Sequence, residues 1–523
     1  LSALRYWLIY NCYKTSLLLT ANSGQLWLTK CQTENTFIRL PCLTYGMSNK
    51  MKLSVPESRG FIHDFWETRI LPALMAYIRI PNQSPAFDPA WETNGYMDQA
   101  VRLAHEWCVR HGPEDMSAEI ISSEHRTPVL LLEIPARGAP EQSRGAVLLY
   151  GHLDKQPPLE EGVWRKGLGP RSPVREGDRL YGRGGVDDGY AVFTSLAALL
   201  LLREQGLAHP RCLVLIECSE ESGSPDLGYY VERLRERIGE PELAICLDSS
   251  CGSYDRLWLT TSLRGMIGGV LTVSVLEEGV HSGDAGGIVP SSFRIARALL
   301  ERIEDQNTGQ IRPEFQVAIP GQCIEEAGIT ADALGPDPFS RFPLVPGMKI
   351  TVEDVSAGLI ERTWKPALEV IGAEGFPGVR VAGNVLRPQT TLKLSLRVPP
   401  ALDTGKASKT LKRIMESHPP YGARVTYREE WNFGGWRAPA LAPWLHAAVQ
   451  ESSGAFFGKS AVCYGEGFSI PFMATLADSF PDAQFVVTGA MGPHANAHGP
   501  NEFLHVEMAK KITLCIAEIL ARS

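Results

Sequence analysis

The hydrophobic pattern of this chain has a short apolar run at residues 146–150, and the candidate functional residues are best described starting from this run. It is rich in Val and Leu and is bounded by Gly145 and Gly151, which predicts a buried strand. His152 and Asp154 follow it two residues apart, so both side chains point to one side of an extended chain. Open α/β sheets bind ligands at the carboxyl ends of their strands, so this pair could belong to a site. The simpler interpretation is a strand followed by a polar turn without a functional role.

Apolar runs with strand and helix spacing alternate through the first half of the chain. Helices are expected at 58–78, 94–111, 191–203 and 225–237, and strands at 127–135, 145–150, 211–217 and 243–247. Strands that alternate with helices in this way predict a largely parallel sheet and an α/β fold.

The pattern changes near residue 262. Strands are expected at 266–276 and 392–398 and helices at 290–305 and 403–417, while 309–365 is rich in Pro and Gly and is expected to be irregular. We interpret 262–432 as an inserted α+β module. A helix at 441–453, a strand at 484–488 and a helix at 506–521 would then complete the first domain, so that 51–261 and 433–523 form one unit.

The first residues fit neither pattern. Residues 1–46 lack clear periodicity, and a signal-peptide apolar region is a poor match. We therefore expect 1–50 to be a poorly ordered N-terminal extension, with Met47 or Met51 as the natural start of the protein.

Composition narrows the possible functions. The 523 residues are 44% hydrophobic and 21% charged, with a net charge of −8, so nothing favours binding to nucleic acid. The longest apolar run, near 191–202, is too short to cross a membrane. The 11 cysteines include no CxxC pair, which argues against a thiolate zinc site and favours a reducing compartment such as the cytoplasm.

Polar side chains gather at the predicted strand ends. They are His152, Asp154, Asp187, Glu220, Glu221 and Asp248, joined late in the chain by His494 and His498 of GPHANAHGPNE. Imidazoles and carboxylates without cysteine are ligands for zinc, with manganese or cobalt possible. The alternatives are a helix cap for the acids at 187–188 and a solvated turn for those at 220–221. His494 is better interpreted as a loop residue than as a ligand.

The ordered set GHLD, GRGGVDD, EES, an isolated Asp after a strand, HSGDAGG and AHGPNE resembles the M20 metallopeptidases, and among them the cytosolic nonspecific dipeptidase and carnosinase group. The resemblance runs from about residue 50 to the end. It implies a mostly parallel-sheet α/β catalytic domain with an inserted α+β lid and dimerisation domain.

The resemblance also implies a metal centre with two Zn²⁺ per chain, Mn²⁺ or Co²⁺ being possible. His152 and Asp248 match the ligands of one ion, and Glu221 and His498 match those of the other. Asp187 matches the carboxylate that bridges the two ions, an arrangement found in two-metal hydrolases.

Further roles follow from the same resemblance. Asp154 matches the acid that orients the histidine ligand, and Glu220 matches the general base that takes a proton from water. His281, in HSGDAGG, matches a lid residue that helps to hold the oxyanion and often acts across a dimer interface.

Three residues match positions that contact substrate. Arg397 resembles the arginine that pairs with the terminal carboxylate of the substrate, although it can also be interpreted as a strand-end charge. Ser469 and Glu466, in GEGFSIP, resemble positions beside the substrate.

Three departures from the dipeptidase pattern bear on specificity. Lys155 stands where GHLDVQP has valine, and Gly189-Tyr190 stands where a lysine usually follows the aspartate pair. Phe433 precedes Gly434-Gly435, where the dipeptidases have histidine.

These features predict a cytoplasmic metal-dependent hydrolase, active as a homodimer through the lid domain. We expect it to hydrolyse the peptide bond of dipeptides, or to release the C-terminal amino acid of a short peptide as a carboxypeptidase does. The alternatives are an N-acyl-amino-acid deacylase or desuccinylase of the same family, and a non-catalytic binding relative. No nucleic acid or membrane partner is expected.

Overall fold

The computed structural model describes residues 17–22, 25–30, 52–138, 145–159, 162–336 and 338–523. The chain divides into two units, at 1–52 and 53–523. In the first unit, strands β1 (Leu17–Asn22) and β2 (Gln25–Lys30) pair antiparallel. The expectation of a poorly ordered extension ending near Met47 or Met51 falls largely outside the described residues and stays a prediction.

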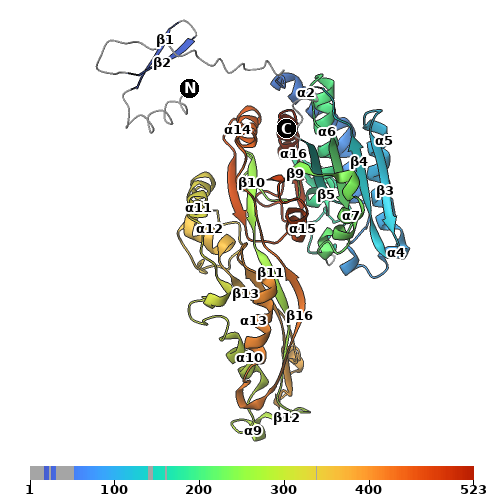
Figure 1. Ribbon diagram of the computed structural model, residues 1–523. Coiled ribbons are helices and arrows are strands. Elements are labelled where there is room, and N and C mark those ends of the chain that lie inside the picture. Colours follow the sequence, from blue (N-terminus) through green and yellow to red (C-terminus); the bar gives the residue numbers. More distant parts are fainter. Residues whose placement is uncertain (1–16, 23–24, 31–51, 139–144, 160–161, 337) are drawn as a thin grey trace. The chain divides into compact units, whose positions relative to one another are not determined.

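A six-stranded sheet forms the centre of the second unit (Figure 1). Its order is β19 (Gln484–Val487), β9 (Pro241–Cys246), β5 (Ala146–His152), β8 (Cys212–Glu217), β4 (Arg126–Ile134) and β3 (Ser117–Ser123). The first four strands are parallel to one another. At one edge β4 pairs antiparallel with β8, and β3 pairs antiparallel with β4. The predicted α/β class with a mostly parallel sheet is confirmed.

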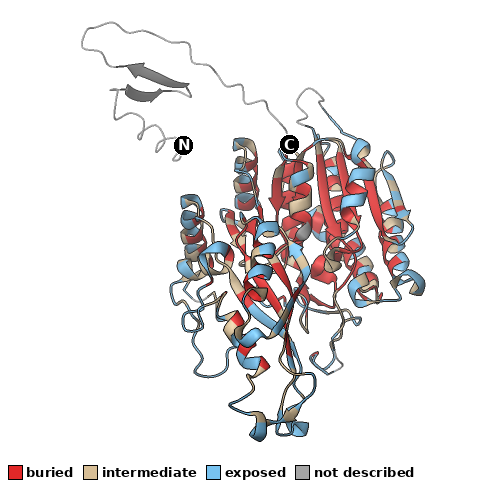
Figure 2. Ribbon diagram, turned by 60° about the horizontal axis from the view of Figure 1, so that its bottom comes forward, coloured by how far each residue is buried: buried red, intermediate tan, exposed pale blue. Residues whose placement is uncertain are grey.

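The inner strands β9, β5, β8 and β4 are buried on both faces, which explains why they are nearly continuous apolar runs, whereas the edge strand β3 is partly exposed. In β8, Val214 faces one core and Leu215 the other, because successive side chains point to opposite faces. One core is covered by α2 (Val55–Phe65), α3 (Leu71–Ile78), α5 (Tyr96–His111), α6 (Ala191–Glu204), α14 (Pro443–Phe457) and α16 (Val506–Leu520). The other is covered by α7 (Leu227–Arg233) and α15 (Pro471–Ser479). Figure 2 shows the buried strands between helices with exposed outer faces.

The inserted module is built on a separate four-stranded antiparallel sheet. Its order is β13 (Ala367–Glu374), β15 (Gln389–Val398), β11 (Gly265–Ser274) and β16 (Arg424–Phe433). Helices α10 (Ser292–Leu300) and α13 (Thr404–Glu416) bury their apolar faces on it in a core of its own. The predicted inserted α+β module is therefore present, and its boundaries at 262 and 432 stay predictions.

Smaller elements connect these sheets. Strand β10 (Trp258–Leu263) pairs with β17 (Trp436–Arg437) and β18 (Val462–Glu466), and β7 (Arg179–Tyr181) pairs with β6 (Val174–Glu176) and β20 (Phe503–His505). Short helices α4, α8 and α9 cover Trp91–Asn94, Arg235–Ile238 and Ser282–Ala285. Strand β12 (Val280–His281) pairs with β14 (Val385–Leu386) at the far end of the lid (Figure 1).

The prediction that 309–365 is irregular is wrong. Helices α11 (Gly321–Leu334) and α12 (Val355–Trp364) form there and lie against β18. Pro320 and Gly335 bound α11 from outside, so the Pro and Gly residues terminate helices instead of excluding them. Two smaller corrections concern 225–237, which is divided into α7 and α8, and 58–78, where a π-helical turn at Trp66–Ile70 separates α2 from α3.

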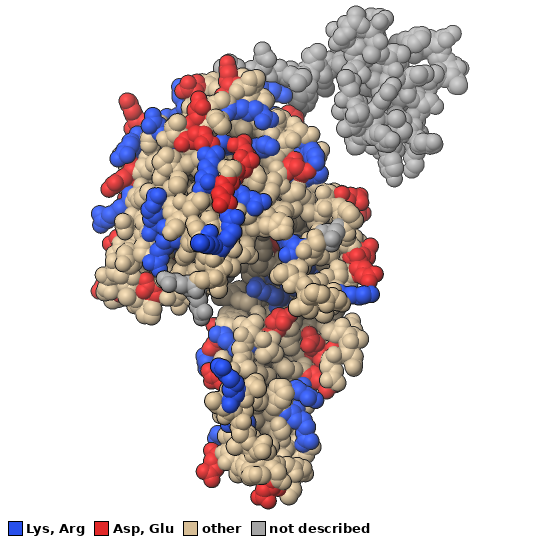
Figure 3. Space-filling view, turned by 180° about the vertical axis from the view of Figure 1, so that it is seen from behind, with Lys and Arg blue, Asp and Glu red and all other residues tan. Residues whose placement is uncertain are grey.

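One helical stretch, Gly185–Glu204, has the length and apolar composition of a membrane span, but 94% of its apolar window is buried inside the structure. It is the core helix α6 with the loop before it. All eight cysteines within the described ranges are free thiols. Figure 3 shows acidic and basic side chains interspersed on one face of the protein.

Candidate metal centre

The polar residues predicted from strand ends meet at the carboxyl edge of the six-stranded sheet. His152 is the last residue of β5, whereas the sequence had predicted that the strand ends at residue 150 and that His152 lies just past it. Asp248 follows β9, and the 220–221 pair follows β8. Because parallel strands end at one edge, residues that are far apart in the chain come together there.

One group of donors consists of His152, Asp187 and Asp248, all buried. The Nε2 atom of His152 lies 3.2 Å from Oδ1 of Asp187 and 3.7 Å from Oδ2 of Asp248. The three donor atoms lie within 4.8 Å of one another, a separation at which a single ion can be bound by all of them.

A second group consists of Asp187, Glu221 and His498. The Nε2 atom of His498 lies 2.9 Å from Oδ2 of Asp187 and 3.3 Å from Oε2 of Glu221. Asp187 belongs to both groups and offers a different oxygen to each. This is the arrangement that a carboxylate bridging two ions requires.

Asp154 supports both groups without belonging to either. Its Oδ1 atom lies 3.4 Å from Nδ1 of His152, the ring nitrogen that faces away from Asp187. Its two carboxylate oxygens also accept hydrogen bonds from the backbone amides of Glu220 and Glu221, at 3.0 and 2.9 Å. Asp154 therefore orients the imidazole and holds the loop that carries the neighbouring acids.

Glycine at position 151 is required by close approach. A Cβ atom there would lie 2.5 Å from Cβ of Ala191 and 2.7 Å from Oδ2 of Asp188. Asp188 is fully buried and accepts a hydrogen bond from the backbone amide of His152 at 3.3 Å. No described side chain caps the start of α6, so the alternative that the acids at 187–188 form a helix cap is wrong, while an effect of the helix dipole stays a prediction.

The centre carries an excess of negative charge. Burial and the nearby Asp187 raise the pKa of Glu221 to about 8, and burial raises that of Asp248 to about 6. Burial and Asp248 also raise the pKa of Glu220 well above its ordinary value. For Asp187, hydrogen bonds with the two imidazoles outweigh burial and lower the pKa. Crowded buried carboxylates of this kind are stabilised in their charged form by bound cations.

A cleft of about 770 Å³ opens beside the donors. This volume is typical of small-molecule sites. Asp187, Glu220, Glu221 and Asp248 form its floor, and Arg397 of the lid faces it together with Ser469. The Arg397 guanidinium donates a hydrogen bond to Oγ of Ser469 at 2.9 Å, and Ser469 donates to the backbone oxygen of Arg264 at 2.5 Å.

The other sequence-predicted residues lie elsewhere. Glu466 is buried and pairs with Arg362 at 3.2 Å, in a smaller cavity next to the cleft. His281 lies on β12 at the far end of the lid and is exposed, so the structure does not bring it to the donors of its own chain (Figure 1). His494 lines the cleft but belongs to neither donor group.

Three residues that sequence reasoning missed also support the centre. Arg183 forms an ion pair with Glu502 and donates hydrogen bonds to the backbone oxygens of His498 and Gly499, each at 3.1 Å. Gln156 donates to Oε2 of Glu221 at 2.6 Å. Arg183 stands within GRGGVDD and Glu502 within AHGPNE, so the motifs contained them, but their pairing spans 319 positions.

The structure shows where two of the three departures from the dipeptidase sequence pattern lie. Lys155 is buried, and its ammonium donates hydrogen bonds to the backbone oxygens of Tyr77 and Ile80 at the end of α3, at 2.9 and 2.8 Å. The Phe433 ring lies against Gly223, where a Cβ atom would be only 3.1 Å from the ring. Lys155 is therefore a structural residue, whereas Phe433 lies at the loop of the acidic pair.

A third donor group contains His63, Glu67 and Glu507. The Lys510 ammonium already lies among them, 2.8 Å from Glu67 and 2.6 Å from Glu507. A positive charge therefore occupies the position that an ion would take, and this group is not a metal site.

Comparisons with known proteins agree with this geometry. Residues 148–522 match the profile of peptidase family M20/M25/M40. The chain is 29% identical to a cysteinylglycine-S-conjugate dipeptidase of Corynebacterium striatum, over 72% of this chain and 80% of that protein. It is 25% identical to the Beta-Ala-His dipeptidase of Mus musculus, over 75% of this chain and 80% of that protein.

Among solved structures, human carnosine dipeptidase 1 superposes with a TM-score of 0.72 at 19% identity, covering 90% of this chain and 98% of the other. An M20 family metallo-carboxypeptidase from Sulfolobus solfataricus superposes with a TM-score of 0.68, also at 19% identity, over 86% and 98% of the two chains. At this level of identity the superpositions show a common fold.

Proposed function

This chain belongs to the peptidase family M20/M25/M40, and from that premise we propose that it is a metallodipeptidase. It hydrolyses the peptide bond of dipeptides or releases a C-terminal amino acid from a short peptide. The observation that carries the proposal is that Asp187 belongs to both donor groups. One of its oxygens faces His152, in the group with Asp248, and the other faces His498, in the group with Glu221. The similarity to named dipeptidases supports the same reaction.

The donor set fits two divalent cations. Two imidazoles and three carboxylates beside the cleft, most of them buried and His498 exposed to it, suit zinc, with manganese or cobalt as alternatives. We assign His152 and Asp248 to one ion, Glu221 and His498 to the other, and Asp187 to both. When bound, the two ions supply Lewis acidity and make water a nucleophile at neutral pH.

Glu220 is our proposed general base. It faces the cleft beside the donors, and Asp154 holds its backbone in place. The Glu220 carboxylate takes a proton from the attacking water as the water oxygen bonds to the peptide carbon. It then returns that proton to the nitrogen as the carbon–nitrogen bond breaks, which gives a carboxylic acid and an amine; the second water proton, still on the acid, passes to the amine, so that a carboxylate and an ammonium group leave.

Arg397 and Ser469 are proposed to hold the carboxylate at the C-terminal end of the substrate. They line the same cleft as the acidic residues, and a guanidinium pairs well with a planar carboxylate. Holding that end fixed orients the scissile bond over the donors. A cleft of about 770 Å³ with a fixed anion site at one end favours short peptides over proteins.

We further propose that the protein is a homodimer through the lid. The lid exposes large apolar side chains, among them Ile288, Val379 and Val381, which are 83%, 94% and 78% exposed. Apolar groups this exposed are typical of association surfaces. His281 lies in the same part of the lid, so it would reach an oxyanion only in the site of a partner chain.

The cross-chain role has a direct test. His281→Ala and Glu220→Gln are each expected to retain about 1% of the native kcat or less, about 10²-fold or more below it, but mixed dimers would contain one site with both native residues. Partial recovery of activity on mixing supports the dimeric site, and confirmed mixed dimers without recovery would refute it. We also propose a cytoplasmic location, which is supported by the free thiols of the described cysteines.

The test of the function is a hydrolysis assay. Protein loaded with Zn²⁺ or Mn²⁺ is given a panel of dipeptides and of N-acyl amino acids, and amine release is measured. Glu220→Gln, which removes a proton acceptor with little change in shape, is expected to lower kcat by about 10²-fold or more while metal content is retained. Turnover of N-acyl amino acids without turnover of dipeptides would replace the dipeptidase with a deacylase.

A further inference from the structure

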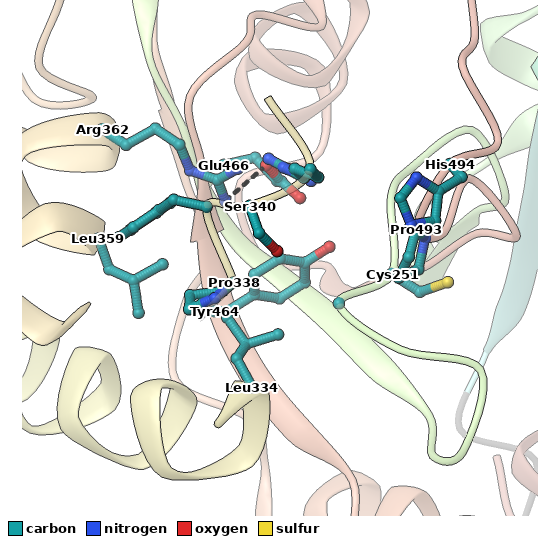
Figure 4. A pocket seen from close by; sticks show the side chains of 13 residues that line it. Cys251, Leu334, Pro338, Ser340, Leu359, Arg362, Tyr464, Glu466, Pro493 and His494 are labelled. Carbon is teal, nitrogen blue, oxygen red and sulfur yellow. Dashed lines mark ion pairs between the residues drawn. The ribbon is translucent and has the colours of Figure 1, made fainter. Parts of the chain in front are cut away.

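A second cavity of about 210 Å³ lies next to the cleft (Figure 4). The two spaces share Arg341 and His494 in their linings, so the smaller one adjoins the cleft. Its volume is below that of sites for whole small molecules, which are about 300–1,000 Å³. It is the size expected for one side chain of a substrate that lies in the cleft.

The walls of this cavity present hydrogen-bond donors. Tyr464 is 97% buried, and its hydroxyl makes no hydrogen bond of normal geometry with the described residues. Burial and the neighbouring Glu466 carboxylate raise the pKa of this hydroxyl well above its ordinary value. Figure 4 shows this hydroxyl turned toward the side on which Cys251, Pro493 and His494 lie. The Nε atom of Arg362 is likewise buried and lacks a described partner. Buried donors normally have an acceptor, so their pairing here is incomplete without a ligand.

The charge of the cavity is positive. Arg362 is neutralised by its pair with Glu466, the one carboxylate in the described lining. Arg341 forms no ion pair with any acid in the described ranges, and the same Glu466 carboxylate is its acidic neighbour, so two guanidinium groups face one carboxylate and the described lining keeps a net positive charge. Next to the cavity, burial together with Arg397 and Arg362 lowers the pKa of Arg264 to about 10. Guanidinium groups therefore outnumber carboxylates on this side of the cleft.

We propose that this cavity is a specificity pocket for a substrate side chain that ends in a carboxylate. The inference rests on the proposed dipeptidase function and extends it to a substrate class, namely dipeptides that contain an aspartyl or glutamyl residue. The carboxylate pairs with Arg341 and accepts a hydrogen bond from Tyr464. The pocket is separate from Arg397, which holds the main-chain carboxylate.

The test compares dipeptides that differ only in one side chain. Glutamate, glutamine and norleucine are placed in turn at each of the two positions, and kcat/KM is measured with the metal-loaded enzyme. At one position the glutamyl peptide is expected to exceed the norleucyl peptide by about tenfold or more, since a site built for a polar group rejects an analogue without it. Glutamine separates the two contributions, because it keeps an acceptor but has no charge.

Substitutions in the pocket test whether it causes the preference for glutamyl peptides. Arg341→Gln and Tyr464→Phe should each lower the ratio of glutamyl to norleucyl kcat/KM about tenfold, which is the loss of one charge-assisted hydrogen bond. Arg341→Glu should shift the preference toward a lysyl dipeptide. Arg294→Gln, which removes an exposed arginine elsewhere on the lid, is the matched control and should leave the ratio unchanged.

The outcomes separate the pocket from the function. Equal kcat/KM for glutamyl and norleucyl dipeptides at both positions overturns the pocket and leaves the dipeptidase intact. Absence of all dipeptide hydrolysis overturns the function. In that case the pocket is tested by calorimetry, which measures binding of the glutamyl and norleucyl peptides to the metal-loaded Glu220→Gln variant. Tighter binding of the glutamyl peptide supports the pocket. Equal or undetectable binding of the two peptides overturns it.

Discussion

The pair formed by Arg183 and Glu502 gives the sharpest prediction about how the metal centre is held. Both side chains are almost fully buried. Arg183 also donates to the backbone oxygens of His498 and Gly499, and Glu502 accepts from the amide of Gly184 at 2.8 Å. The pair therefore ties the loop of His498 to the loop that precedes Asp187. We consider the change Arg183→Met.

Two effects should follow from that change. Removing one partner of a buried pair leaves the other charge unpaired, which costs about 3–5 kcal/mol of unfolding free energy. The cost should lie at the lower end of that range, because Glu502 keeps its hydrogen bond from Gly184. Releasing the His498 loop should also weaken metal binding by about 10- to 100-fold, the usual effect of losing an outer contact that orients a ligand.

A double variant separates the two effects. Replacing both residues, as Arg183→Met with Glu502→Leu, removes the unpaired charge, so unfolding free energy should return close to that of the native protein. The contacts that hold the His498 loop remain absent, so metal affinity should stay low. Stability is measured by denaturant unfolding with chelator present, because bound metal would itself stabilise the fold. Metal affinity is measured by competition with a chelator.

The pH dependence has a definite sign. Burial raises the pKa of Glu502 above its ordinary 4.5 in the folded protein, and loss of Arg183 raises it further. An acid with a raised folded pKa binds more protons when folded, so its contribution to stability falls as pH rises above 4.5. Arg183→Met should therefore be more destabilising at pH 8 than at pH 5.5. A double variant that regains both stability and metal affinity would refute the proposed role of the pair.

Three further predictions concern the metal ligands, the lid and the packing below the site. Asp187→Ala should lose both ions and Asp248→Ala only one, as elemental analysis after dialysis would show; equal losses would contradict a bridging role. His281→Ala should lower kcat by about 10²- to 10³-fold with a smaller change in KM, as for loss of an oxyanion donor, and wild-type kinetics would exclude the residue. Lys155→Met should cost about 1–3 kcal/mol of unfolding free energy, because two buried carbonyls lose their donor. The exposed Lys166→Met is its control and should change stability by less than about 0.5 kcal/mol.

The local pattern was most informative where a strand is buried on both faces. The apolar runs at 146–150 and 211–217 were located within two residues of β5 and β8, because such strands have few polar positions and end at glycine or charge. The pattern failed for 309–365, where α11 and α12 form. Their sequences are interrupted by turn residues on both sides, and packing against β18 outweighs that weak local preference.

Some residues of the candidate site were also predictable from local sequence, and others were not. The sequence indicated a set of polar residues at strand ends and in short motifs, and the resemblance to the M20 metallopeptidases selected five of them as donors, namely His152, Asp187, Glu221, Asp248 and His498. It did not indicate that Glu466 would pair with Arg362 in the smaller cavity beside the cleft, or that His281 would lie at the far end of the lid, away from the donors of its own chain. Both outcomes depend on how the lid folds.

By itself, therefore, the sequence determined the fold class, the order of the elements and the chemical identity of the donors, all of which are properties of short stretches of chain. Only the tertiary structure decided how these stretches are held together. The Arg183–Glu502 pair joins residues 319 positions apart, and the Lys155 ammonium caps a helix that ends 77 positions before it. Such contacts cannot be derived from spacing or periodicity, because a buried charge is stable only with a partner that the fold brings to it.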